Sequence, residues 1–328
     1  MATAPLLSVV IPTFKRPVTL RRAIDSAFEA VADGELEVVV VPNGHDDSWK
    51  RTAAGYASDS RVKWHYLATG GASGARNHGL AAATGKYVRF LDDDDVLYPS
   101  AAQQLQALDD ERGDISTGPL NNVYPGNSVD SVTGVPDSAD FVTAALRITT
   151  VGMCQGSVFR TDLVRACAWP TNAVLYDDYI WMLEVAKHRE WNWKRWTTPV
   201  AAYMHHFDER LSYARRSGSN SEQVITAILA LYESLQRQSR DSAQRRRAVA
   251  GALLTHAHSA FPAAPLRLTR AIRTAREIDA GAAPLQAIFE RHPKIARHVA
   301  LAEWAALLPR YLTRGWRRLG WRARRFIH

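Results

Sequence analysis

Two short apolar runs joined by one amphipathic stretch constrain the fold of this chain more than any other feature. Ser8–Pro12 and Glu37–Val41 are dominated by consecutive apolar side chains, which is typical of strands buried on both faces of a sheet. Between them, Pro17 opens a predicted helix that continues to about Val31 with its apolar side chains on one face. A strand, a crossover helix and a second strand predict a parallel pair with a helix packed on the sheet.

The same alternation continues through the first hundred residues. Arg61–Leu67 predicts a third strand, Gly74–Thr84 a second helix, and Tyr87–Leu91 a fourth strand. The chain is therefore predicted to be an α/β protein with a Rossmann-like, mostly parallel sheet flanked by helices.

Beyond residue 100 the pattern is less regular. Ser116–Gly134 is rich in Gly, Asn, Ser and Pro and predicts loops or short strands. Val151–Phe159 predicts a strand, Tyr176–Lys187 a helix, and Pro199–His206 a further strand. From about Asn220 the chain is predicted to be helical to its end, with breaks at prolines.

Three polar segments follow the predicted strands of the first hundred residues. They are Pro12–Phe14, Pro42–Gly44 and the four consecutive aspartates Asp92–Asp95. Ligands of parallel α/β sheets bind at the carboxyl ends of the strands. We therefore expect these segments to converge on one ligand site.

The aspartate run predicts a bound divalent cation. Like charges this close raise one another's pKa unless a cation neutralises them. Hard carboxylate oxygens suit Mg²⁺ or Mn²⁺, and Mg²⁺ is commonly shared with substrate phosphates. The alternative is an acidic, solvated turn that caps the following helix.

Four motifs occur in a fixed order along this part of the chain. They are the strand and loop Ser8–Arg16, the strand and turn Glu37–Gly44, the Ala-Arg-Asn-x-Gly segment Gly74–Gly79, and the Asp-x-Asp segment Phe90–Asp95. Together they make residues 6 to about 215 resemble the inverting glycosyltransferases of family 2, which have the GT-A fold.

The resemblance implies an enzyme that moves a sugar from a nucleotide-diphosphate sugar to an acceptor hydroxyl, with Mn²⁺ or Mg²⁺ as cofactor. The implied acceptor is a glycan, a lipopolysaccharide or a lipid-linked carbohydrate. Residues 1–100 would form the nucleotide-sugar-binding half of the GT-A domain, and residues 101–215 its acceptor-binding and catalytic half. Residues 216–328 would form a basic helical C-terminal region.

The resemblance also implies roles for single residues. Asn43 is expected to contact the nucleobase, Arg76 to lie near the diphosphate, and Asp92 to face the ribose and sugar. Asp94 is expected to bind the metal, with Asp93 or Asp95 able to share this task. The further residues expected at the nucleotide sugar are Pro12, Thr13, Phe14, Arg16, Gly44 and Asp93.

Tyr176–Trp181 resembles the Glu-Asp motif of the family, which opens a helix. This resemblance makes Asp178 the general base that takes the proton of the acceptor hydroxyl, with Asp177 in the place of the usual Glu. The alternative is that both acids only cap the helix and favour its dipole.

Tyr203–His206, followed by Leu211-Ser212, resembles a Tyr-x-x-His…Leu-Ser ending. His206 is expected to be a metal ligand or a diphosphate contact, or else a histidine at a strand edge. His205 is expected to point to the opposite face of a regular strand.

Two positions depart from the family pattern. Pro42 stands where the family usually has Asp, so the contact with the base falls on Asn43 and on backbone groups. Glu184 stands where many members have Arg, which bears on contacts with the acceptor.

The C-terminal third is strongly basic. Residues 216–328 hold 20 Lys and Arg against 7 Asp and Glu, whereas residues 1–215 hold 21 against 26. Arginines interleaved with Trp and Leu between Trp304 and Phe326 predict contact with an anionic membrane surface. The alternative is a basic helix docked on the rest of the protein. Nucleic acid is not an expected partner, because no reading motif accompanies the charge.

The remaining bulk features agree with a cytoplasmic protein, peripheral on the inner face of the cytoplasmic membrane. Cys154 and Cys167 are the only cysteines, which fits a reducing compartment. No apolar run approaches the roughly 18 residues of a membrane span, so we expect none.

Other functional classes fit less well. The Gly-rich loops of nucleotidyltransferases and of dinucleotide oxidoreductases are missing after the first strand, where the sequence is Thr13–Arg16. The alternative that remains is a non-catalytic protein of the same fold, which binds nucleotide sugar or organises a membrane assembly.

Overall fold

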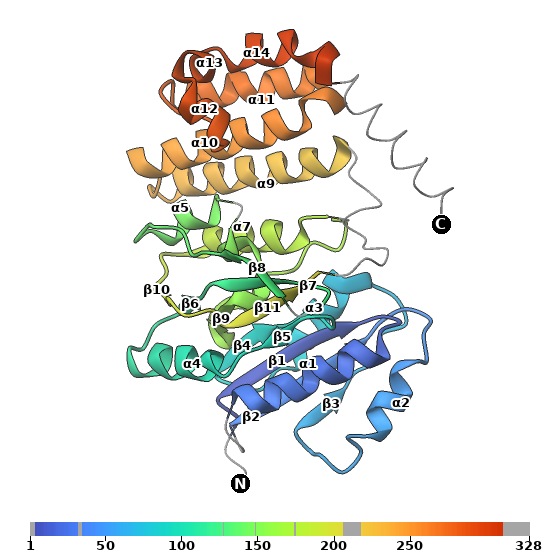
Figure 1. Ribbon diagram of the computed structural model, residues 1–328. Coiled ribbons are helices and arrows are strands. Elements are labelled where there is room, and N and C mark those ends of the chain that lie inside the picture. Colours follow the sequence, from blue (N-terminus) through green and yellow to red (C-terminus); the bar gives the residue numbers. More distant parts are fainter. Residues whose placement is uncertain are drawn as a thin grey trace, which may run out of the picture. The chain divides into compact units, whose positions relative to one another are not determined.

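The computed structural model describes residues 4–31, 35–126, 128–147, 149–173, 175–205 and 218–310. The chain divides into two compact units, Met1–Arg215 and Arg216–His328 (Figure 1). His206 and the arginine-rich segment after Arg310 lie outside the described residues, so the predictions made for them stay predictions.

A seven-stranded sheet forms the centre of the first unit, in the order β10-β6-β9-β4-β1-β2-β3. Neighbouring strands are parallel except where β9 pairs with β4 and β6. The prediction of an α/β fold with a mostly parallel sheet is confirmed. The strands are β1 (Leu7–Thr13), β2 (Leu36–Pro42), β3 (Val62–Trp64), β4 (Tyr87–Phe90), β6 (Ile115–Thr117), β9 (Ser157–Arg160) and β10 (Trp193–Arg195).

The central strands β1 and β2 are buried along their whole length, as their continuous apolar runs predict. Their register pairs Thr13 with Pro42, and Leu91 at the end of β4 donates its N–H to the carbonyl of Val10 at 3.0 Å. The three polar segments that follow these strands therefore converge at one edge of the sheet.

Helices cover both faces of this sheet. Leu20 and Ile24 of α1 share a core cluster with Val9 and other β1 and β2 residues of one face. On the other face α3 lies so close to β1 that a Cβ at Gly79 would stand 2.3 Å from Val10 Cγ1. The glycine of the Ala-Arg-Asn-x-Gly motif thus permits this close packing. The helices of the first unit are α1 (Pro17–Ala30), α2 (Trp49–Ala54), α3 (Gly71–Ala82), α4 (Ser100–Asp110), α5 (Phe141–Ala145), α6 (Thr161–Val164) and α7 (Asp177–His188).

A smaller four-stranded sheet, in the order β5-β11-β7-β8, completes the first unit. The Gly- and Asn-rich segment that predicts loops or short strands forms β6 and the antiparallel hairpin of β7 and β8. The strands of this sheet are β5 (Val96–Leu97), β7 (Leu120–Tyr124), β8 (Ser128–Thr133) and β11 (Ala201–Met204).

Some predicted boundaries are wrong. Val151–Phe159 is not one strand: two 3-10 turns, η1 (Thr150–Gly152) and η2 (Cys154–Gly156), precede β9. A Cβ at Gly156 would stand 2.5 Å from Thr150 Cγ2, so the glycine allows the chain to fold back on itself here. The third strand is shorter than Arg61–Leu67, and α3 begins before Gly74.

The second unit is helical in its described part, as its sequence predicts. Prolines stand at helix starts, where the missing N–H costs nothing: Pro265 begins α11 and Pro293 begins α13. Within the described residues no helix is both long and apolar enough to cross a bilayer. The helices are α9 (Gly218–Arg237), α10 (Ala243–Ala260), α11 (Pro265–Ile278), α12 (Ala287–Arg291), α13 (Pro293–Arg297) and α14 (Val299–Ala305), with the 3-10 turn η3 (Phe261–Ala263).

Candidate active site

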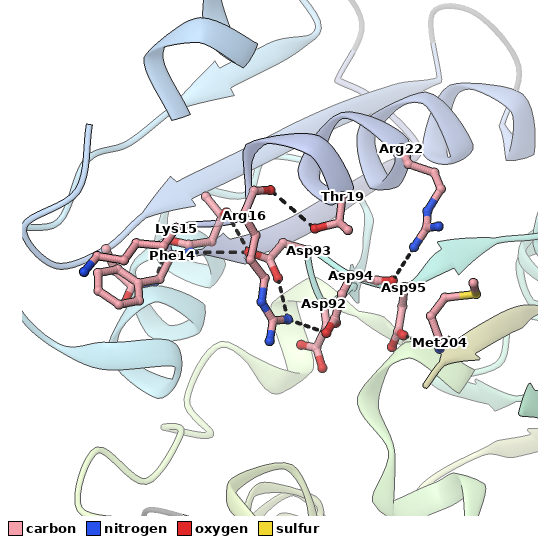
Figure 2. A network of polar contacts seen from close by, with 12 residues as sticks. Phe14, Lys15, Arg16, Thr19, Arg22, Asp92, Asp93, Asp94, Asp95 and Met204 are labelled. Atoms are coloured by element: carbon pink, nitrogen blue, oxygen red, sulfur yellow. Dashed lines mark hydrogen bonds and ion pairs between the residues drawn. The ribbon is translucent and has the colours of Figure 1, made fainter. Parts of the chain in front are cut away.

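The four consecutive aspartates have different surroundings, although they share one loop after β4 (Figure 2). Asp93 accepts hydrogen bonds from the Thr13 hydroxyl at 2.7 Å and from the Phe14 N–H at 3.3 Å. Asp95 is fully buried and accepts from Gln155 Nε2 and the Met204 N–H, each at 2.8 Å. The run is therefore a set of individually held carboxylates rather than a solvated acidic turn.

Three of these carboxylates could hold a cation together. Oxygen atoms of Asp92, Asp94 and Asp95 lie within 4.8 Å of one another. Such a group of hard anionic ligands fits Mg²⁺ or Mn²⁺. Asp93 is directed to the β1 loop instead, and desolvation raises the pKa of its carboxyl to about 6.

Arg16 faces the same carboxylates from the start of α1. Its Nη1 forms ion pairs with Asp94 and, at 3.3 Å, with Asp93 (Figure 2). A second arginine of α1, Arg22, donates from Nη2 to the backbone carbonyl of Asp94 at 2.8 Å. Two arginines at the start of α1 thus hold the aspartate loop, Arg16 at its carboxylates and Arg22 at a backbone carbonyl.

The loops after β1 and β2 form the neighbouring part of the site. Asn43 is buried, and its Nδ2 donates to the Thr13 carbonyl at 3.0 Å. Gly44 has a φ of +77°, and a Cβ there would stand 2.9 Å from the Phe14 ring. Phe14 itself is 45% exposed. Its ring is therefore available to a ligand at the carboxyl edge.

Sequence reasoning missed one residue of these loops, Asp46. Its carboxylate accepts the N–H of Lys15 at 2.8 Å and so ties the β2 loop to the β1 loop. Lys15 has a φ of +58°, an unusual conformation for a residue with a side chain. The acidic residues that follow Pro42–Gly44 in the sequence were the signal that could have identified Asp46.

Arg76 joins two acidic residues across the site. Its buried guanidinium donates to Asp92 at 2.6 Å and to Asp177 at 2.8 Å, and stacks on Trp169 at 4.6 Å from the ring centroid. Asp177 also accepts from the Ser73 hydroxyl at 3.0 Å. The structure therefore places Arg76 between the aspartate loop and the start of α7.

Asp178 lies beside Asp177 at the start of α7. Desolvation, and then the charge of Asp177, raises the pKa of Asp178 to about 7, against the opposing charge of Arg76. Its Oδ1 accepts the N–H of the next residue, Tyr179, at 2.8 Å. A carboxyl with this pKa can change its protonation state near neutral pH, as a general base must.

A buried arginine of β4 positions Asp95 indirectly, and the sequence did not reveal it. Arg89 Nη1 donates to the Gln155 carbonyl at 2.9 Å, and Nη2 donates to Gln104 Oε1 at 2.5 Å. Burial lowers the pKa of Arg89 to about 9. Gln155 in turn reaches Asp95 from η2, inside the segment that was wrongly predicted to be a strand.

His205 ends the described part of the histidine motif. Its ring stacks on Tyr124 with centroids 4.2 Å apart, and its Nε2 lies 3.3 Å from Asn122 Oδ1. This histidine therefore belongs to the face of the small sheet formed by β7 and β11.

The mostly parallel sheet flanked by helices matches the GT-A class of glycosyltransferase folds, and a cation-capable acidic cluster lies at its carboxyl edge. Solved structures agree on the fold. The Staphylococcus aureus protein TarS, residues 1–349, superimposes with a TM-score of 0.67 at 16% identity, covering 94% of this chain and 91% of that one. A mannosyltransferase from Pyrobaculum calidifontis, solved with GDP-Man and Mn²⁺, gives a TM-score of 0.50 at 17% identity, covering 93% and 88%.

Residues 8–150 match the family described as Glycosyl transferase family 2. The uncharacterised glycosyltransferase YibD of Escherichia coli is 36% identical over 108 residues, 32% of this chain and 31% of that protein. A Campylobacter jejuni GalNAc(5)-diNAcBac-PP-undecaprenol beta-1,3-glucosyltransferase is 36% identical over 104 residues, 31% and 33% of the two chains. The matched segment spans about a third of these relatives.

Proposed function

We propose that this protein is an inverting, metal-dependent glycosyltransferase that uses a nucleotide-diphosphate sugar. One observation carries the proposal: Arg76 connects Asp92 of the cation-capable cluster to Asp177, the neighbour of Asp178. The cation-capable cluster is thereby linked to the start of α7, where Asp178 has a carboxyl pKa raised to about 7. Single displacement at a sugar carbon needs both.

The donor would bind along the carboxyl edge of β1, β2 and β4. The base and ribose would meet the loop of Pro12, Thr13 and Phe14, and the turn at Asn43 and Gly44. One N–H of the Asn43 amide is held by the Thr13 carbonyl, so its oxygen and second N–H would meet the base together with the Phe14 ring and backbone groups. Arg16 and Arg76 would supply positive charge to the diphosphate side.

Asp92, Asp94 and Asp95 would hold the Mn²⁺ or Mg²⁺, with His206 as a further ligand. When bound, the cation supplies Lewis-acid stabilisation of the departing diphosphate. The choice of these residues rests on the proximity of their oxygen atoms. The Pyrobaculum mannosyltransferase binds GDP-Man with Mn²⁺, which supports a cation of this kind.

Asp178 would act as the general base. As the acceptor oxygen forms its bond to the anomeric carbon, the bond from that carbon to the diphosphate oxygen breaks. The hydroxyl proton passes to the Asp178 carboxylate. Attack from the face opposite the leaving group inverts the sugar carbon.

The basic second unit would bring the enzyme to an anionic membrane carrying a lipid-linked or lipopolysaccharide acceptor. Arg270 and Arg273 of α11 are exposed at a spacing of three residues, beside the exposed Leu266. Cationic and apolar side chains on one helix surface favour anionic lipid interfaces. Co-sedimentation with vesicles of phosphatidylglycerol but not of phosphatidylcholine is the expected result, and Arg270→Glu with Arg273→Glu should weaken it.

A donor screen tests the proposed reaction. The protein is incubated with UDP-, GDP- and dTDP-sugars, with Mn²⁺, Mg²⁺ or EDTA, and release of nucleoside diphosphate is measured. Metal-dependent release from at least one donor is expected. Donor binding without any turnover or transfer would favour the non-catalytic alternative, and absence of both would refute the proposal.

A further inference from the structure

The Arg16 guanidinium contacts one of the carboxylates that could hold a metal ion. Its Nη1 pairs with Asp94, one of the three residues whose oxygens could hold a cation, and with Asp93 at 3.3 Å (Figure 2). A cation beside these carboxylates offsets the repulsion within the aspartate run. The arginine thus supplies part of the charge that a divalent ion would bring.

The partners of Asp94 and Asp95 differ in how firmly they are held. Asp95 accepts from buried Gln155 and from the backbone N–H of Met204. Asp94 pairs with a side chain that is 38% exposed. A partly exposed arginine can take another rotamer at little cost, whereas a strand N–H cannot move away alone.

Arg76 provides an internal comparison. Its side chain is 7% exposed, lies between Asp92 and Asp177, and stacks on Trp169. These contacts fix Arg76 as part of the framework of the site. Of the two arginines Arg16 and Arg76, Arg16 is the one that can change its partner while the fold stays intact.

We propose that Arg16 is an exchangeable cation: it neutralises Asp93 and Asp94 in the donor-free protein, and it moves to the diphosphate when metal and donor bind. This inference rests on the proposed use of a nucleotide-diphosphate donor. A guanidinium suits both partners, since it binds carboxylate and phosphate oxygens with the same planar donor geometry.

The exchange makes metal and nucleotide binding interdependent. Without nucleotide, the metal must compete with Arg16 for Asp94, so metal alone binds weakly. A nucleoside diphosphate draws Arg16 away and strengthens metal binding, and by linkage the metal strengthens nucleotide binding by the same factor. Arg16 thereby restricts a fully assembled metal site to the donor-bound protein.

Two binding affinities of the Arg16→Gln variant test the exchange: one for Mn²⁺ without nucleotide and one for nucleotide at saturating Mn²⁺. Mn²⁺ binding without nucleotide is measured from the electron paramagnetic resonance signal of free Mn²⁺, and UDP, GDP and dTDP binding at saturating Mn²⁺ by calorimetry. We expect Arg16→Gln to bind Mn²⁺ alone about tenfold more tightly and its nucleotide about tenfold more weakly, within the usual range of coupling between sites. Arg16→Lys should lie between wild type and Arg16→Gln in both affinities.

Arg21→Gln is the matched control. Arg21 lies on the same helix and carries the same charge, but it pairs with Asp25 at 3.8 Å. Its substitution should change neither affinity by more than about twofold, because Arg21 is 73% exposed and pairs with Asp25 rather than with the aspartate run.

The outcomes distinguish a failure of the Arg16 exchange from a failure of the proposed glycosyltransferase function. If wild type binds a nucleoside diphosphate with Mn²⁺, but Arg16→Gln binds Mn²⁺ alone no more tightly than Arg21→Gln, the exchange is refuted and the proposed function stands. A loss of both affinities in Arg16→Gln would make Arg16 merely structural and would also refute the exchange. If wild type binds no nucleoside diphosphate with any metal, both proposals fail.

Discussion

Asp92 and Asp177 accept hydrogen bonds from the two terminal nitrogens of one buried guanidinium, that of Arg76. The first residue follows β4 and the second begins α7, so a single side chain joins two distant parts of the sequence. Since Asp178 follows Asp177, the position of the proposed base depends on this contact.

Replacing Arg76 should therefore damage both stability and catalysis. Arg76→Gln leaves two carboxylates without their shared cation, and we expect the free energy of unfolding in urea to fall by about 2 kcal/mol, less than for a fully buried pair because both aspartates are partly exposed. Arg21→Gln should stay within about 0.5 kcal/mol of wild type. An Arg76→Gln protein as stable as Arg21→Gln would contradict the role assigned to this contact.

Asp178→Asn separates donor binding from transfer. The amide keeps the shape of the side chain but cannot take a proton, so we expect the transfer rate to fall about 10³-fold. Donor affinity, measured by calorimetry with Mn²⁺, should change by less than about threefold, since Asp178 belongs to no part of the proposed donor site. Equal losses of donor binding and transfer would count against Asp178 as the base.

The pH dependence follows from the raised pKa of Asp178, about 7. The base acts only when deprotonated, so the transfer rate should rise with pH through 7 and level off above about pH 8. At pH 6 about one tenth of the carboxyl is ionised, and the rate should be about tenfold below its plateau. A turnover rate at saturating donor and Mn²⁺ that stays flat between pH 6 and 8 would exclude this assignment.

Gly79 offers a test of how closely α3 packs on the sheet. A Cβ at this position would stand 2.3 Å from Val10 Cγ1, so Gly79→Ala should lower the free energy of unfolding by about 1–3 kcal/mol. Gly74→Ala on the same helix is the matched control, because its Cβ would meet only Leu67 Cδ2 at 3.7 Å. It should be neutral or stabilising by up to about 1 kcal/mol. Equal effects of the two substitutions would contradict the observed packing.

The sequence was sufficient to predict the centre of the fold and the edge of the sheet at which the polar segments meet. The apolar runs of β1 and β2 leave few alternatives to a buried parallel pair, and the polar segments at their ends had to meet at one edge. Their convergence at Thr13, Pro42 and Leu91 is confirmed by the strand register.

The hydrogen-bond and ion-pair partners of the aspartates come from distant parts of the sequence and could not be predicted in the same way. Gln155 reaches Asp95 from a glycine-containing turn whose apolar residues resemble a strand in sequence. The pairing of Arg16 with Asp94 depends on the angle at which α1 leaves β1, and no local pattern records that angle. Periodicity identifies which face of an element is buried, but not which polar side chain from another element will contact it.

The central claim is a metal-dependent glycosyl transfer organised by the aspartate run, and Asp94→Ala tests it most directly. Release of nucleoside diphosphate from the preferred sugar donor is measured for wild type and Asp94→Ala across a Mn²⁺ titration, with Arg21→Gln as control. We expect metal-dependent release for wild type and the control, and a loss of about 10³-fold in Asp94→Ala. Wild-type release that is unaffected by EDTA, or an Asp94→Ala protein that keeps its Mn²⁺-dependent rate, would contradict the account.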